Sequence, residues 1–294
     1  QVQYILDEQG PIDPRDSSFN TPLHLALLHK HPLVAKLFID RGASHLARTM
    51  DLLSPLHIAA SKNMLEIVAL LLEKGAPIDQ TDLTNSTPLH RAVLFDCVDV
   101  VKHLVDKRCS INASDAQGLT PLHIAVQKGN MEIVTYLIAK GARTDVADKE
   151  GNKIMHHAVV FEQIDVLRYL KEHGRSLTDE QGDSSVSLLH LSAEIGSEAI
   201  VRYLLDEGVP IDIKDAYHQT PLHFAIFFGR LSIAAELIKR GALVGALVIN
   251  GANLVHVAVQ SGKIEVLEYV MCLGLDVNAS DHEGQKPLHF AVRK

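Results

Sequence analysis

A four-residue phrase recurs nine times along this 294-residue chain at an almost constant spacing. It reads Thr-Pro-Leu-His in four copies and is slightly altered in the other five. The copies begin at Thr21, Ser54, Thr87, Thr120, Lys153, Ser187, Thr220, Asn253 and Lys286. Successive starts are 33 residues apart, except for 34 residues between Lys153 and Ser187. A fixed period of this length predicts a stack of small units rather than one globular core.

The repeat that begins at Thr120 indicates what one unit contains. Thr120 is a good helix N-cap, because its hydroxyl can accept a hydrogen bond from a free N–H of the first turn. Pro121 suits the first helical position, where a missing N–H costs nothing. We expect a first helix over about 121–128 and a second over about 131–139, separated by a Gly-Asn break. Gly141 ends the second helix, and a polar turn follows.

The second helix of each unit carries a narrow apolar face. In the repeat at Thr120 this face consists of Ile133, Val134, Leu137 and Ile138, whose spacing is that of one side of a helix. Two helices of two or three turns cannot bury such a surface alone. Stacked on their neighbours, they form one elongated core.

This pattern resembles the ankyrin repeat over essentially the whole chain: Thr-Pro-Leu-His-x-Ala, a Gly between the helices, Gly-Ala after the second helix and an Asp-x-x-Gly turn. The resemblance implies an all-α solenoid of stacked helix-turn-helix units with β-hairpin fingers, whose activity is to bind another protein. We expect a single domain over 1–294 that is a segment of a larger protein. It would comprise a partial repeat at 1–20, repeats starting at 21, 54, 87, 120, 153, 187, 220 and 253, and a partial repeat at 286–294.

Composition excludes several classes of function. The formal net charge is −8 and no lysine or arginine run occurs, which argues against nucleic-acid binding. No stretch of 18 apolar residues occurs, so we expect no membrane insertion by this segment. Three scattered cysteines, Cys97, Cys109 and Cys272, favour a reducing, intracellular setting. We expect a monomeric domain in the cytoplasm, with the cytoplasmic face of a membrane or the nucleus as alternatives.

The 17 histidines do not indicate a metal site. Nine of them end the repeated phrase, and residues 33 apart in a stack form a ladder rather than a cluster. The resemblance implies that these histidines bond the backbone and tie neighbouring repeats together. Phosphate-binding, nucleophile-elbow and zinc-protease motifs do not occur, so we expect a non-enzymatic segment with no cofactor. Asn112 resembles asparagines that are hydroxylated in some animal ankyrin domains, which is a hypothesis about modification only.

The resemblance implies that a protein partner is bound by the residues just before the inter-helix turn and by the finger tips. The candidates before the turn are Leu94, Phe95, Val160, Phe161, Ile195, Phe227 and Phe228. The candidates at finger tips are Tyr217 and Ile249. Half of the chain's eight phenylalanines fall in the first set, and aromatic anchors are typical of binding hot spots.

Two stretches depart from the pattern. The finger over 243–249 is apolar and lacks the usual Asp, which predicts either a docking edge or an aggregation hazard. The repeat at Lys153 lacks both Thr and Pro, so we expect it to be the softest interior repeat.

The leading hypothesis for function is a protein-interaction module or scaffold. The alternatives are the cytoplasmic ankyrin domain of a membrane channel or receptor, and the substrate-recruiting domain of a larger enzyme or effector.

Overall fold

The computed structural model describes residues 11–178 and 185–293, and over these residues the chain folds into 17 helices and no strand. The expected all-α architecture of helix-turn-helix pairs is therefore confirmed. Its contacts form two compact units, one within 1–149 and one within 150–294. That all repeats belong to a single domain stays a prediction.

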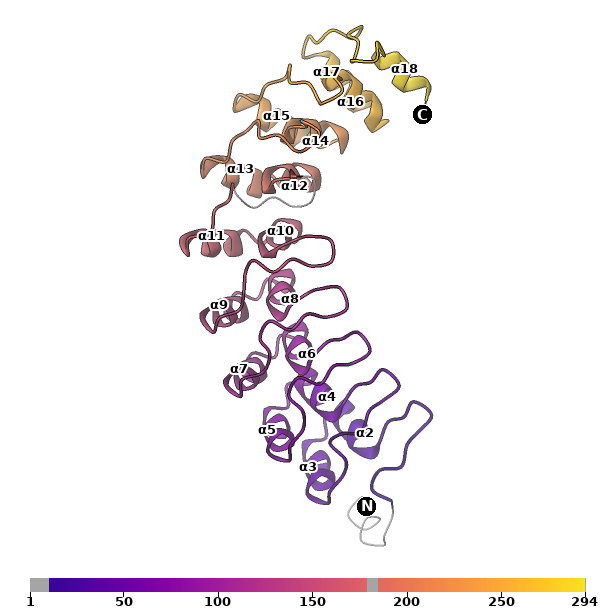
Figure 1. The fold of residues 1–294 in the computed structure, drawn as a ribbon, viewed down its shortest axis with the longest axis vertical. Coiled ribbons are helices and arrows are strands. Elements are labelled where there is room, and N and C mark those ends of the chain that lie inside the picture. The colour runs from indigo at the N-terminus through magenta and orange to yellow at the C-terminus, as the bar shows by residue number, and fades with distance from the viewer. Residues whose placement is uncertain (1–10, 179–184, 294) are drawn as a thin grey trace. The chain divides into compact units, whose positions relative to one another are not determined.

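The first unit contains four helix pairs (Figure 1). Their first helices are α2 (Pro22–Leu28), α4 (Pro55–Ser61), α6 (Pro88–Leu94) and α8 (Pro121–Lys128). Their second helices are α3 (Pro32–Asp40), α5 (Leu65–Glu73), α7 (Val98–Asp106) and α9 (Met131–Ala139). Each first helix packs on the next first helix, and each second helix on the next second helix. The bounds of α8 and α9 match those expected from the sequence.

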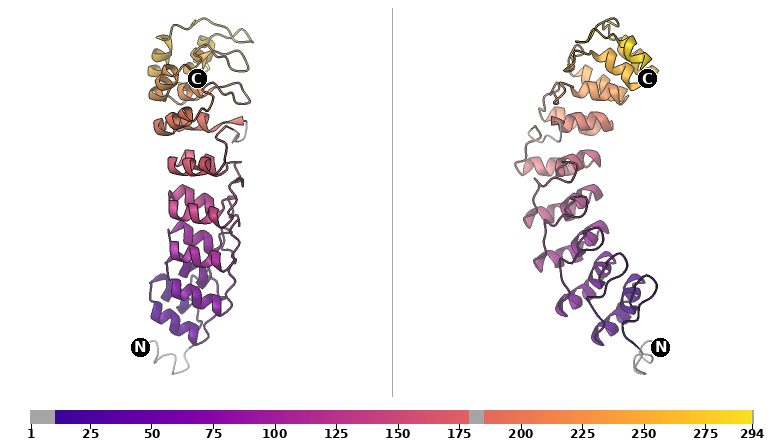
Figure 2. Two further views of the ribbon diagram at one scale, coloured as in Figure 1. Left: turned by 90° about the vertical axis from the view of Figure 1, so that its left-hand side faces the viewer. Right: turned by 45° about the vertical axis from the view of Figure 1, so that its right-hand side comes forward.

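The second unit continues the same pattern. Its first helices are α10 (Ile154–Val160), α12 (Leu188–Ile195), α14 (Pro221–Phe227), α16 (Leu254–Ser261) and α18 (Pro287–Val292). Its second helices are α11 (Ile164–Glu172), α13 (Glu198–Asp206), α15 (Leu231–Lys239) and α17 (Ile264–Met271). Figure 2 shows the helices of each pair lying side by side within a unit, with the loops gathered along one side.

The repeated phrase starts most of the first helices through reciprocal hydrogen bonds. The Thr87 hydroxyl accepts from the backbone N–H of His90, and the backbone N–H of Thr87 donates to His90 Nδ1 over 3.1 Å. Ser54, Thr120 and Ser187 make the same pair of bonds. A cap of this kind contributes about 1 kcal/mol. The predicted N-cap at Thr120 is confirmed.

The histidine of the phrase also connects neighbouring repeats. His57 Nε2 lies 3.1 Å from the carbonyl oxygen of Ser86, and His190 Nε2 lies 2.9 Å from that of Gln219. His90 and His256 reach the next repeat in the same way. Since Nδ1 accepts from a backbone N–H, the ring proton resides on Nε2, which donates to the carbonyl. The expected tie between repeats is confirmed at these four histidines.

The core of each unit runs between the two rows of helices. The leucine of the phrase is fully buried at Leu56, Leu89 and Leu122. The second helix contributes residues such as Ile133 and Val134, which are also buried, and together these side chains exclude water between repeats. Burial of one such side chain contributes about 1.5–3 kcal/mol.

The fingers that follow the second helices are hairpin-like turns without regular strand. In the finger at Asp82, the carboxylate Oδ1 accepts from the N–H groups of Thr84 and Ser86 over 2.8 and 3.0 Å. In the first unit, each tip from Met50 onward donates one backbone hydrogen bond to the preceding finger, as Leu83 N does to Asp51 O over 3.0 Å. The same single bond recurs in the second unit, where Ile249 N donates to Tyr217 O over 2.8 Å.

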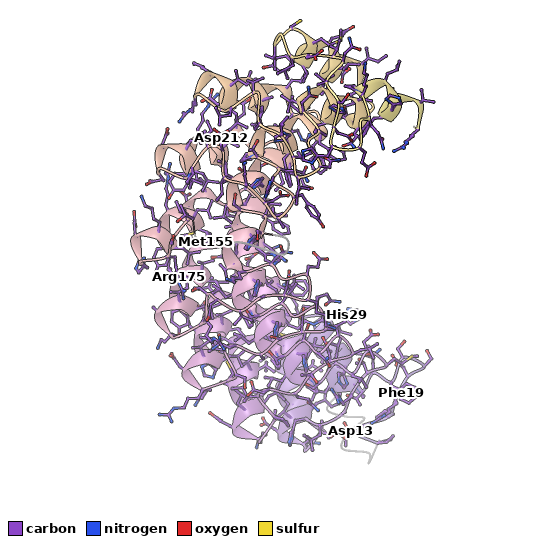
Figure 3. The ribbon with its side chains drawn as sticks, turned by 45° about the horizontal axis from the view of Figure 1, so that its top comes forward. Asp13, Phe19, His29, Met155, Arg175 and Asp212 are labelled. Atoms are coloured by element: carbon purple, nitrogen blue, oxygen red, sulfur yellow. The ribbon has the colours of Figure 1, made fainter. Side chains whose placement is uncertain are left out.

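Side-chain oxygens make a further connection at the base of the fingers. Asp13, labelled in Figure 3, accepts from the backbone N–H of Ser44 over 3.0 Å. Asp212, also labelled there, accepts from that of Leu243 over 3.0 Å, and Asn112 accepts from that of Arg143 over 2.8 Å. Each of these bonds connects the base of one finger to the base of the next. The position of the finger tip is fixed as a result.

The repeat at Lys153 departs from the pattern in the expected place. Its N-cap side chain has no acceptor oxygen, although the Lys153 backbone N–H still donates to His156 Nδ1 over 3.2 Å. The hairpin that contains the extra residue lies partly outside the described residues. That this repeat is the softest interior one stays a prediction.

Candidate functional site

The candidate partner-binding residues are mostly exposed. Seven of them, Leu94, Phe95, Val160, Phe161, Tyr217, Phe227 and Ile249, expose between 41% and 55% of their surface. Ile195 and Phe228 are half-buried. Leu94 and Phe95 belong to the first unit and the other seven to the second. Phe95, Phe161 and Phe227 belong to the repeats that begin at 87, 153 and 220. Exposed phenylalanine side chains are uncommon on a solvated surface, because burial of their apolar area is favourable.

The second unit contains a hollow that two of these residues, Phe227 and Phe228, help to line. It has a volume of about 310 Å³ and is lined by Gln219, Phe224, Phe227, Phe228 and Gln260. Gln219 comes from the base of a finger, while Phe224 and Phe227 are on α14 and Gln260 is on α16. The hollow therefore lies between the finger row and the row of first helices. An open apolar hollow with amide groups at its edge can hold one large side chain of a partner.

Aromatic contacts hold the walls of this hollow in place. Phe227 and Phe228 meet edge to face with their ring centroids 5.1 Å apart, and Phe224 lies 6.3 Å from Phe228. On its other side Phe224 meets His190 edge to face at 4.9 Å. Such contacts contribute about 0.5–1.5 kcal/mol beyond the area they bury. The exposed ring of Phe227 is thus held in place by its contact with Phe228, which in turn contacts Phe224.

Further along the second unit, two finger tips form an apolar edge. Tyr217 and Ile249 are joined by the backbone hydrogen bond between their two finger tips. Leu243 and Leu247, in the finger of Ile249, expose 63% and 48% of their surface. The finger keeps its turn without the usual Asp, because Asn250 Oδ1 accepts from the N–H of Ala252 over 3.2 Å.

The first unit also presents exposed apolar groups. Phe95 ends α6, and its carbonyl oxygen accepts from the Cys97 thiol over 3.4 Å. A hollow of about 340 Å³ lies between the first two fingers and the first helices, where Leu28, Met50 and Ile58 contribute its apolar surface. Another, of about 450 Å³, lies where α3 and α5 begin, is lined by residues within 30–32 and 63–67, and includes none of the candidates. No aromatic side chain lines either one.

Titratable groups near these surfaces have structural explanations. Burial raises the pKa of the Cys97 thiol and of the Glu194 carboxyl, although Arg230 opposes the shift at Glu194. Over residues 11–178 and 185–293 there is no group of three or more His, Cys, Asp or Glu side chains arranged to hold a metal ion. Among the same residues, no helix is long and apolar enough to cross a membrane.

Sequence reasoning did not select Phe224, Gln219, Arg230 or Lys263. Phe224 precedes Phe227 by three residues on one helix, and that spacing could have placed both rings on the same face. Arg230 and Lys263 occupy equivalent positions in two successive repeats, and an alignment of the repeats shows that both are positively charged. Gln219 gives no local signal, because only packing brings it to the hollow.

Comparison with known proteins identifies the repeat. Family models of ankyrin repeats match residues 19–50, 45–115, 108–181, 175–247 and 255–294. An E3 ubiquitin-protein ligase, KEG, of Arabidopsis thaliana is 35% identical over 123 residues, which are 41% of this chain and 8% of the ligase.

Two other relatives match a similar share of this chain. A transient receptor potential cation channel subfamily A member 1 homolog of Caenorhabditis elegans is 30% identical over 39% of this chain and 9% of its own length. The human SH3 and multiple ankyrin repeat domains protein 2 is 29% identical over 41% of this chain and 7% of its own length. The chain thus spans less than a tenth of each of these three relatives. Because the family models match nearly the entire chain, it belongs to the ankyrin repeat family.

Proposed function

We propose that this chain is a non-enzymatic protein-interaction module that binds a partner in the groove between its fingers and first helices. Ankyrin repeats generally mediate protein–protein interaction, which supports the general class. The single observation that carries the finer proposal is the hollow beside Phe224, Phe227 and Phe228. A partner side chain of leucine or phenylalanine size would fill it and bury apolar surface on both molecules.

The flanking tips extend this surface. Tyr217 and Ile249 lie on the finger side of the second unit, and Val160 and Phe161 end α10 of the same unit. In the first unit, Leu94 and Phe95 offer a separate pair of contacts. We further propose an intracellular location, which is supported by three free cysteines, two of them buried.

The test compares partner capture by a groove variant and by a control variant. Phe227→Ser together with Phe228→Ser removes the aromatic wall, and we expect the captured partner to be lost. Ile264→Ser together with Met271→Ser removes two exposed apolar side chains from α17, outside the groove, and we expect the partner to be retained. Helical content measured for both variants shows whether they remain folded. Partner capture that survives in the folded groove variant would refute the proposal.

The relatives support two alternatives of a different class. The ligase suggests a substrate-recruiting domain of a larger enzyme, and the channel suggests the cytoplasmic repeat domain of a membrane protein. In both, this segment would still act by binding. A catalytic motif or a membrane span elsewhere in the parent protein would distinguish them from a scaffold.

A further inference from the structure

Two cations occupy the same repeat position beside the hollow. Arg230 directly precedes α15, and Lys263 directly precedes α17. The equivalent residues of the earlier repeats carry no fixed charge: they are His31, Met64, Cys97, Asn130, Gln163 and Ser197. Cations at this position are therefore confined to the two repeats that supply the walls of the hollow.

Both cations reach back to the preceding repeat. Lys263 Nζ donates to the carbonyl oxygen of Phe228 over 2.9 Å, and Arg230 Nε donates to that of Glu194 over 2.9 Å. These carbonyls lie at the C-terminal ends of α14 and α12, where helical partners are missing and the helix dipole is negative. A lysine has three donors and an arginine five, so each side chain keeps N–H groups for a ligand.

Two glycines make this arrangement possible. Gly229 and Gly196 have φ angles of 71° and 92°, in the left-handed region. A Cβ on Gly229 would lie 2.6 Å from Lys263 Nζ, and one on Gly196 would lie 2.9 Å from Arg230 Cδ. Because these two glycines have no side chain, the side chains of Lys263 and Arg230 can pass beside them to reach the preceding repeat. Lys263 Nζ is thus held against the backbone of Phe228, and Arg230 Nε is held against that of Glu194, one repeat earlier.

Neither cation is neutralised by an ion pair. In the described part of the chain, no carboxylate pairs with Arg230 or Lys263. The Glu194 carboxyl interacts electrostatically with Arg230, which opposes the rise in the pKa of that carboxyl.

We propose that this groove selects an acidic peptide segment of a partner protein. An apolar side chain of the segment fills the hollow beside Phe227 and Phe228, and a nearby Asp or Glu side chain pairs with Lys263 and Arg230. This inference rests on the proposed function, since it names the chemistry of the segment that the groove binds. Charge complementarity carries it, because in the described part of the chain these two cations have no carboxylate partner, while the chain as a whole has a net charge of −8.

Selection of displayed peptides tests the chemistry without a known partner. A library of random peptides, attached through their C-termini, is selected on the 294-residue chain and counter-selected on the Phe227→Ser, Phe228→Ser variant. We expect the retained peptides to combine a large apolar residue with an excess of Asp and Glu. Retained peptides without that excess would overturn the acidic preference while leaving groove binding intact. Absence of peptides that depend on the two phenylalanines would overturn both proposals.

Charge variants then test the contact itself with one selected peptide. Replacing both cations, Arg230→Gln with Lys263→Gln, should weaken binding roughly threefold to thirtyfold, as expected for two exposed ion pairs. Lys239→Gln removes an equal charge on α15 outside the groove and should leave the affinity unchanged. A peptide with its acidic residues changed to amides should bind the parent chain weakly and be insensitive to the double variant. The inference would be overturned if the double variant lost as much affinity for the amide peptide as for the acidic one. It would also be overturned if Lys239→Gln reduced the affinity for the acidic peptide as much as Lys263→Gln does.

Discussion

Mild acid should destabilise this fold through its buried histidines. Burial lowers the pKa of His57 and of His223 from 6.5 to about 4, and it lowers the pKa of His24, His90 and His190 in the same direction. The hydrogen bonds explain why protonation is unfavourable. Nδ1 of His57 already accepts from the Ser54 backbone N–H over 3.2 Å. Protonation of Nδ1 would place its new N–H against that N–H donor, which is unfavourable.

The direction and size of the effect follow from linkage. Because the pKa of His57 is lower in the folded state, its contribution is present above the unfolded value of 6.5 and is lost as the pH falls toward about 4. At about pH 5 the unfolded imidazole is mostly protonated and the folded one is mostly neutral, which costs about 2 kcal/mol for this one residue. Carboxyl groups with ordinary pKa values titrate mainly below this window, so the buried histidines dominate the change between about pH 7 and pH 5.

The assay is urea denaturation followed by circular dichroism at about pH 7 and about pH 5. His57→Gln keeps an amide that can donate to the Ser86 carbonyl but cannot titrate, so the pH-dependent loss of stability should shrink by about 2 kcal/mol. His29→Gln changes an exposed imidazole and serves as the control. The reasoning is refuted if both variants lose as much stability between the two pH values as the parent chain does.

Three further changes test local features of the fold. Lys153→Thr supplies the missing cap oxygen and should raise the free energy of unfolding by about 1 kcal/mol; an unchanged thermal midpoint would contradict this. Leu52→Asn relieves a left-handed backbone with φ 58°, so it should add about 1 kcal/mol in denaturant titration, and a loss of stability would count against it. Amide hydrogen exchange should be faster in residues 154–172 than in 121–139, whereas equal protection would show that the repeat at Lys153 is not soft.

The helix boundaries could be predicted because local chemistry determines them. Thr120 and Pro121 start α8 at the expected residue, and the glycine after α9 adopts the left-handed conformation that ends a helix. The residues that cap and end a helix are neighbours in the sequence. The repeat at Thr120 was therefore enough to predict how helices begin and end in both units.

The binding surface could be predicted only in part. Phe227 was selected from its place before the turn, and it is exposed; its neighbour Phe228 is half-buried by aromatic contacts. The hollow itself depends on Gln219 and Gln260, which are 41 residues apart and meet only through packing between repeats. The division into two compact units likewise depends on contacts that no single repeat encodes.

The central claim concerns where a partner sits, and hydroxyl-radical footprinting measures this directly. With a selected peptide bound to the 294-residue chain, oxidation of Phe227, Phe228 and Tyr217 should fall strongly. Oxidation of Met271, which is 51% exposed on α17, should not change. Unchanged oxidation of the three aromatic residues, with protection at Met271 instead, would contradict a groove that binds the partner between the fingers and the first helices.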